Sequence, residues 1–120
     1  VPYSRLLDVH QDDWGTIMKV LHTTAWDVTP ARLGDFLANA QRASEIHQRL
    51  GAEATHLIQS MAGPVPAMTY AMVFPDGAAY GAFIDAINTD EEWLALLAEA
   101  FSGERYATIL SQSLGTDLFS

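Results

Sequence analysis

Residues 67–74 are apolar on both sides, and this limits the folds open to the chain. Side chains alternate across a β-strand, so every second residue of the segment shares a face. One face holds the bulky side chains of Met68, Tyr70, Met72 and Phe74. The other holds the smaller side chains of Ala67, Thr69, Ala71 and Val73. A half-exposed strand would have one polar face, so we expect this strand to be covered on both sides.

The rest of the chain reads as alternating strands and helices. Thr29-Pro30 has the hydroxyl and the proline that often start a helix, and Gly51 is typical of a helix end. A second helix is predicted between Gly77 and Gly103, with a break where Thr89-Asp90-Glu91-Glu92 fits a capping box with Thr89 as N-cap. Period-two patterns and turn signals predict the remaining strands over residues 16–28, 55–62 and 108–114, the last extending as far as 119 in a longer interpretation.

The order of these elements is β-α-β-β-α-β, which is the ferredoxin-like split motif. We therefore expect an α+β fold with a four-stranded antiparallel sheet. Crossovers between parallel strands are right-handed in nearly all proteins, and this places both helices on one face of the sheet. The opposite face is then free, and we expect it to be covered by a second copy in a homodimer. Residues 1–15 are interpreted as an N-terminal arm and residues 16–120 as a single domain.

Charge and composition exclude several kinds of partner. The chain has 15 acidic and 6 basic residues and a net charge of −9, and its basic residues are scattered. Nucleic acid and anionic membrane surfaces are therefore poor partners. No apolar run approaches a membrane span of about 20 residues, and there is no cysteine for a disulfide or a thiolate metal site. The sequence begins at Val1 with no visible signal peptide, so we expect a cytoplasmic protein.

Two segments resemble a known superfamily. The stretch Phe74-Pro75-Asp76-Gly77-Ala78-Ala79-Tyr80-Gly81-Ala82-Phe83 resembles the strand-to-helix passage of the dimeric α/β-barrel superfamily. The segment Asn88-Thr89-Asp90-Glu91-Glu92-Trp93 is similar to the D-P-E-W segment of its NIPSNAP-like branch. The resemblance implies a homodimer with a ligand cavity in each subunit. It also implies activities such as those of the antibiotic-biosynthesis-monooxygenase-like enzymes, cyclases, lactone isomerases and haem-handling enzymes. The His-Pro-x-His segment of the plant-type cyclases is absent, because Asn88-Thr89-Asp90-Glu91 occupies its place.

Strand parity suggests the site residues. His22 shares its parity with the bulky residues of its strand, and Tyr70 lies in the bulky set of the neighbouring strand. We expect these bulky faces to line a cavity, while the smaller opposite faces pack under the helices. His22 would then act on a proton and Tyr70 would hold an oxygen. The remaining candidates would bind substrate: Trp26, His56, Met68, Met72 and Met18. His47 is interpreted as a residue at the edge of the core.

Three functions remain open at this stage. The first is an enzyme that acts without metal or cofactor on a small apolar or aromatic, polyketide-like molecule, as a monooxygenase, cyclase or isomerase. The second is a non-catalytic homodimeric ligand-binding or accessory domain. The third is haem handling, which would require an axial ligand such as His22 or His56. No sequence motif for phosphate binding, a nucleophile elbow or a zinc protease is present.

Overall fold

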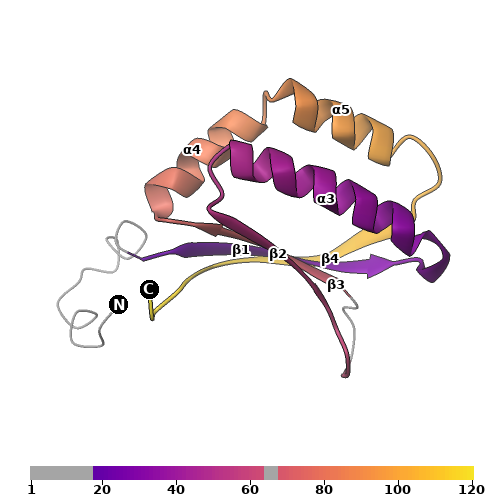
Figure 1. Ribbon diagram of the computed structural model, residues 1–120, viewed down its shortest axis with the longest axis horizontal. Coiled ribbons are helices and arrows are strands. Elements are labelled where there is room, and N and C mark those ends of the chain that lie inside the picture. The colour runs from indigo at the N-terminus through magenta and orange to yellow at the C-terminus, as the bar shows by residue number, and fades with distance from the viewer. Residues whose placement is uncertain (1–17, 64–67) are drawn as a thin grey trace.

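The computed structural model describes residues 18–63 and 68–120 (Figure 1). The predicted arm of residues 1–15 lies outside this range. The elements in chain order are β1 (Val20–Val28), the 3-10 turn η2 (Pro30–Arg32), α3 (Leu33–Arg49), β2 (Ala54–Gln59), β3 (Met68–Phe74), α4 (Gly77–Ile87), α5 (Glu91–Ala100) and β4 (Ala107–Thr116).

The strands form one antiparallel sheet in the order β2-β3-β1-β4. Helices α3, α4 and α5 all lie on the same side of this sheet (Figure 1). Both features were predicted from the sequence, and the α+β ferredoxin-like class is confirmed. Because the second helical region consists of two separate helices, the full order is βαββααβ.

The first helical region begins in two stages. Thr29 occupies the position before η2, but its hydroxyl makes no capping hydrogen bond. Pro30 fixes the backbone of a single 3-10 turn, and the α-helix proper begins at Leu33. Its end is the predicted one: Gly51 has a φ of 127°, a conformation that glycine adopts without steric cost. The first strand begins at Val20, later than the predicted residue 16, whose neighbourhood lies outside the described residues.

The break between α4 and α5 was predicted, but the capping residue was not. The N-cap of α5 is Asp90, whose carboxylate accepts a hydrogen bond of 2.9 Å from the backbone N–H of Trp93. The prediction of Thr89 as N-cap is therefore wrong. Arg49 Nη2 also binds both carboxylate oxygens of Asp90, at 2.9 and 2.8 Å. Asp90 thus caps α5 and ties it to the end of α3.

The register of β1 and β3 decides which sheet face lies under the helices. His22 pairs with Met72 and Thr24 pairs with Tyr70, so these side chains share a face. Phe74 lies on the same face, and its ring contacts that of Phe83 in α4 at a centroid distance of 4.9 Å. The bulky set therefore packs under the helices, and the expectation that the smaller set would do so is wrong. Long side chains from this set reach across to the helices and pack against them.

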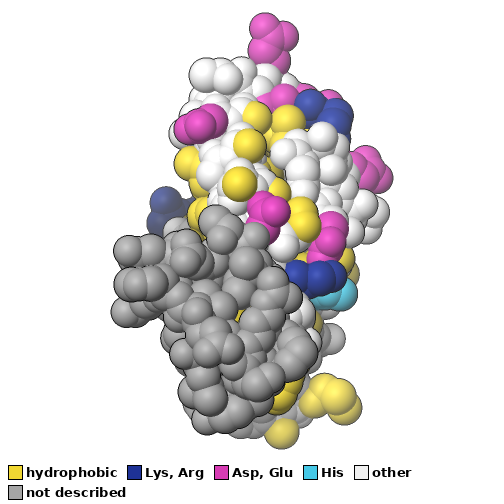
Figure 2. All heavy atoms as spheres, turned by 90° about the vertical axis from the view of Figure 1, so that its left-hand side faces the viewer, with side chains coloured by type: hydrophobic (Ala, Val, Ile, Leu, Met, Phe, Trp, Pro, Cys, Tyr) yellow, Lys and Arg dark blue, Asp and Glu magenta, His cyan; other side chains and the backbone are white. Residues whose placement is uncertain are grey.

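The core consists of two buried clusters on the helical side of the sheet. The first joins α4 to β1 and β3 and contains Val20, Ala52, Met72, Phe74, Phe83 and Ile87. The second joins α3 to the sheet and contains Val28, Phe36, Met68 and Ala107. Charged side chains stay at the surface, where Figure 2 shows basic groups next to acidic ones. No helix in the described part of the chain has the length and apolarity needed to cross a bilayer.

Candidate functional site

A cavity of about 340 Å3 lies between the sheet and the helices and borders both core clusters. This volume is in the range of small-molecule binding sites, about 300–1,000 Å3. Most of its lining is apolar and comes from α3, α4, α5 and the strands below them. The polar side chains in the wall are His22, Thr24, Asn39, His47, Tyr70, Tyr106 and Gln112. A few polar groups in an apolar wall can orient an organic ligand.

His22 enters the cavity wall from the middle of β1. Its Nε2 atom lies 3.0 Å from Oε1 of Gln112 on β4. Because a carbonyl oxygen only accepts hydrogen bonds, Nε2 carries the hydrogen and Nδ1 is left with a lone pair. Nδ1 is buried and has no hydrogen-bond partner within residues 18–63 and 68–120. Buried polar atoms are nearly always paired, so this nitrogen is the acceptor in the wall that most needs a ligand.

His47 and Tyr70 form a second polar pair. Nδ1 of His47, on α3, lies 2.7 Å from the Tyr70 hydroxyl on β3. Only 5% of the His47 surface is exposed. Its ring packs against Trp93 at a centroid distance of 4.7 Å and against Phe83 at 5.5 Å. The pair therefore sits within an aromatic cluster that connects α3, α4 and α5 to the sheet.

Burial keeps both members of this pair neutral. The loss of hydration lowers the pKa of His47 to about 4, and the nearby charge of His22 adds to this in smaller measure. Burial raises the pKa of Tyr70 to about 12, although the hydroxyls of Thr55 and Ser44 partly oppose the shift. Near pH 7 the pair therefore offers hydrogen bonds without adding a charge to the cavity.

The structure brings four of the seven predicted site residues together. His22, Tyr70, Trp26 and Met72 all line the cavity. The expectation that this cavity would face away from the helices is wrong, because α3, α4 and α5 form its roof.

The other three predicted residues lie outside the cavity wall. His56 pairs with Ala71 across β2 and β3 and so lies on the opposite, free sheet face, where it is exposed. Met68 is buried in the cluster under α3, next to Phe36. Met18 is fully buried just before β1 and does not line the cavity.

Several cavity residues were missed at the sequence level, and His47 is the most important. It was assigned to the edge of the core, yet it lines the cavity. Its position on the apolar stripe of an amphipathic helix was an available signal, because an ionisable group there becomes buried. Gln112 and Asn39 had no comparable signal, since each lies among other polar residues of its strand or helix. Among the described residues, no group of three or more His, Asp or Glu side chains is placed to hold a metal ion.

A ferredoxin-like sheet with all helices on one face and a cavity beneath them is the architecture of dimeric α/β-barrel subunits. Several solved structures of this class are similar to the chain. A NIPSNAP family protein of unknown function from Agrobacterium tumefaciens matches with a TM-score of 0.62 and 15% identity, over 83% of this chain and 87% of that chain. HapK from Hahella chejuensis matches with a TM-score of 0.60 and 17% identity, over 86% and 95% of the two chains. SnoaB, a cofactor-independent oxygenase from Streptomyces nogalater, matches with a TM-score of 0.56 and 14% identity, over 83% and 93%.

These similarities confirm the resemblance to NIPSNAP-like and monooxygenase-like proteins at the level of the fold. No family model and no curated protein sequence matches the chain. Sequence identities of this size show a shared fold, and function must be argued from the site itself.

Proposed function

We propose that this protein is an enzyme that binds a small, flat, mainly apolar organic molecule and moves a proton on it without a metal ion. The supporting observation is the cavity of about 340 Å3, in which an unpaired histidine nitrogen lies in a mostly apolar wall. Apolar cavities with a few convergent polar groups are typical ligand sites. A hydroxylated or keto-aromatic molecule has the matching pattern, with an apolar body and an oxygen at its edge.

In this proposal His22 is the general base. Its Nδ1 atom accepts a proton from an acidic O–H or C–H bond of the substrate, while the Gln112 carbonyl keeps the other ring nitrogen protonated. Tyr70 donates a hydrogen bond to the substrate oxygen, and His47 supports it by donating from Nδ1–H to the Tyr70 oxygen. Both groups are neutral near pH 7, so they place no ionised group in the apolar wall. Trp26 and Met72 provide the apolar contacts.

Oxygenation is the reaction that we favour for the resulting anion. An electron-rich carbanion or phenolate can react with O2 without a cofactor, and SnoaB, which shares this fold, is a cofactor-independent oxygenase. For anthrone, a flat tricyclic ketone, deprotonation of the ring CH2 group gives such an anion. Addition of O2 and loss of water then yield anthraquinone, so that one anthrone and one O2 give one anthraquinone and one water.

The test is oxygen uptake and anthraquinone formation with purified protein and anthrone. We expect turnover above the buffer rate, reduced by ~100-fold or more in His22→Phe, since a positioned general base contributes about 10²–10⁴ in rate. His56→Phe is the matched control, because His56 lies on the opposite sheet face and its loss leaves turnover unchanged. A wild-type rate equal to that of buffer contradicts the oxygenase. Quenching of tryptophan fluorescence by anthrone without turnover would instead indicate a ligand-binding protein, since Trp26 and Trp93 line the cavity.

We further propose that the protein is a homodimer that forms through the free face of the sheet. This face carries Ala71 and Val73 from the central strand, with Leu21 and Ala25 beside them. Ile58 lies on the same face and is 56% exposed in the single chain. Ala71 is buried and Val73, Leu21 and Ala25 are half-buried in the single chain, so Ile58 is the exposed apolar side chain among these five residues. Exposed apolar side chains on a sheet face are typical of an interface, and a second copy can present the same surface in return.

A further inference from the structure

A second cavity, of about 400 Å3, adjoins the first. It is more polar than the first, it is open to solvent because most of its lining residues are exposed, and it lies between α3, the end of α5 and the segment that leads into β4. Three residues line both cavities: Asn39, Ala100 and Tyr106. The two cavities are therefore neighbouring compartments of very different polarity.

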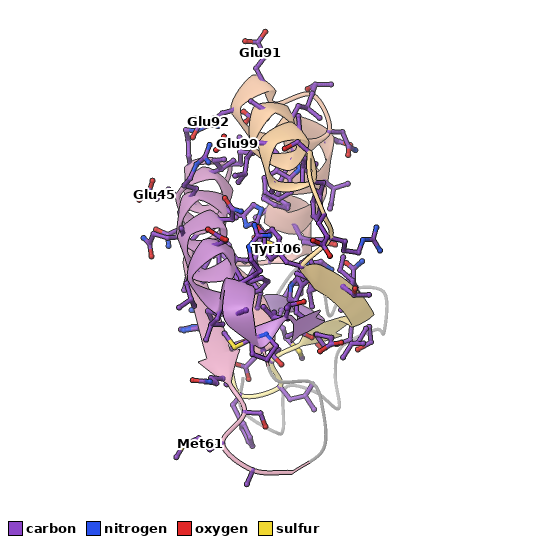
Figure 3. All side chains as sticks on the ribbon, turned by 90° about the vertical axis from the view of Figure 1, so that its right-hand side faces the viewer. Glu45, Met61, Glu91, Glu92, Glu99 and Tyr106 are labelled. Atoms are coloured by element: carbon purple, nitrogen blue, oxygen red, sulfur yellow. The ribbon has the colours of Figure 1, made fainter. Side chains whose placement is uncertain are left out.

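The wall that the cavities share consists of these three residues. The amide nitrogen of Asn39 donates a hydrogen bond to the Tyr106 hydroxyl. In Figure 3 Tyr106 lies between α3 and the start of β4, below Glu99. Ala100 contributes only a methyl group at the end of α5. A ligand that passes this wall meets apolar side chains on one side and charged side chains on the other.

Both arginines of the polar cavity are already paired with a carboxylate. Arg32 binds the carboxylate of Asp35 at 2.6 Å, and Arg42 binds that of Glu99 at 3.1 Å. Glu104 adds a further acidic group to the lining, which then holds two arginines and three acidic residues. An anionic group therefore meets a slightly acidic surface. Neutral hydroxyl groups suit it better, because each can donate to a carboxylate and accept from a guanidinium.

One aromatic ring, that of Tyr106, also lines this cavity. The guanidinium of Arg32 lies over the ring of Tyr106, 4.6 Å from its centroid. This cation–π contact holds the Tyr106 ring in place. The stacked pair presents apolar ring atoms beside guanidinium donors, which matches the mixed C–H and O–H surface of a sugar.

We propose that the polar cavity is a binding subsite for a neutral, hydroxyl-rich group, such as a sugar, attached to the aromatic body that occupies the apolar cavity. The natural ligand is then an amphipathic molecule that spans both cavities past Asn39, Ala100 and Tyr106. This inference rests on the proposed binding of an aromatic molecule and specifies its substituent.

Three matched ligands test the subsite in wild-type protein. They are 2,6-dihydroxynaphthalene, its mono-β-D-glucoside and its mono-β-D-glucuronide, each of which keeps one free phenol for the apolar cavity. Affinities follow from quenching of tryptophan fluorescence and from calorimetry. We expect the glucoside to bind about tenfold more tightly than the diol, which corresponds to one or two additional net hydrogen bonds. The anionic glucuronide binds more weakly than the glucoside, and the difference shrinks in about 1 M NaCl because salt screens the repulsion.

A substitution in the shared wall gives an independent test. Ala100→Phe places a large side chain where the two cavities adjoin, and we expect it to remove the tenfold advantage of the glucoside while the diol still binds. Ala98→Phe is the matched control, because Ala98 is exposed on the same helix and the change leaves all three affinities as in wild type.

The outcomes separate this inference from the proposed function. A glucoside that binds no more tightly than the diol in wild-type protein overturns the subsite, even if the diol binds well. A glucuronide that binds most tightly overturns the preference for a neutral group. If the diol itself does not bind, the apolar site and the proposed function fail, and the subsite fails with them. Because the comparison of ligands uses the wild-type chain, the conclusion stands even if Ala100→Phe does not fold.

Discussion

At the scale of single residues, the most unusual group is the buried, neutral imidazole of His47. Aromatic rings surround it, and its Nδ1 atom pairs with the Tyr70 hydroxyl. Protonation would place a positive charge among these rings with little water to solvate it. The imidazole of His47 is therefore protonated less readily in the folded protein than in the unfolded chain.

This difference predicts how stability depends on pH. The unfolded chain binds a proton at His47 below about pH 6.5, whereas the folded chain does so only near its pKa of about 4. The free energy of unfolding is therefore fully retained above pH 6.5 and falls as the pH drops from 6.5 to 4, by about 3 kcal/mol from this group. His47→Gln keeps a polar partner for Tyr70 but cannot be protonated. Between pH 6.5 and 4 the free energy of unfolding of this variant should therefore fall by about 3 kcal/mol less than that of the wild type. Urea unfolding at pH 7.5, 5.5 and 4.5 measures both proteins, and equal slopes against pH would contradict the prediction.

At the scale of elements, one carboxylate organises the junction between α3, α4 and α5. Asp90 caps the N-terminus of α5 and binds Arg49 at the end of α3. Both contacts stabilise its ionised form, so the Arg49 guanidinium and then the Trp93 N–H lower the pKa of Asp90. A helix as short as α5, with 10 residues, is only marginally stable in isolation, so such contacts help to fix where it begins.

We predict that Asp90→Ala destabilises the protein and that Thr89→Ala does not. The first change removes the cap of α5 and the partner of Arg49, and we expect the midpoint of thermal unfolding to fall by roughly 4 °C or more. The second change is the matched control, because the N-cap contact comes from the neighbouring residue. Thermal unfolding followed by circular dichroism measures both, and an equal fall in the two variants would show that Thr89 shares the capping role.

The junction also shows what the sequence can and cannot predict about elements. The break was predictable because the segment is rich in capping residues. The choice between Thr89 and Asp90 was not, since both are good N-caps locally and Arg49, which is 41 residues away, selects one of them.

In the same way, the alternation in β3 predicts two distinct faces, but a period of two is symmetric and does not say which face lies under the helices. The parity argument therefore grouped His22 and Tyr70 in one cavity, as the structure does, but assigned that cavity to the wrong side of the sheet.

At the scale of the whole molecule, the two layers divide the surface into separate regions. The helical side contains both cavities, and the free sheet face contains the proposed dimer contact. Met72 lies on the helical side and is almost fully buried, so a charge placed there would disrupt the core rather than an interface. The dimer is tested instead at residues such as Val73, which pairs with Leu21 on the free face.

We predict that Val73→Asp converts a dimer into a monomer. Wild-type protein at micromolar concentration should sediment at about twice the 13.1 kDa mass of one chain. The new carboxylate should prevent association, because an unpaired buried charge costs several kcal/mol. Leu94→Asp, on an exposed position of α5 in the helical layer, is the control and leaves the dimer intact. A wild-type protein that sediments as a monomer would contradict the proposed assembly.

The alternation along β3 has a consequence for how such a protein evolves. Tyr70 and Met72 face the ligand cavity, while Ala71 and Val73 between them face the free surface. Under the two proposals above, alternate positions of this one short segment would serve different properties, one set the binding of the ligand and the other association. Substitutions at positions such as Tyr70 and Met72 could then change which substrate is bound, while positions such as Ala71 and Val73 keep the dimer contacts. Such independence allows a single scaffold to diversify in activity while its overall sequence drifts far from that of its relatives.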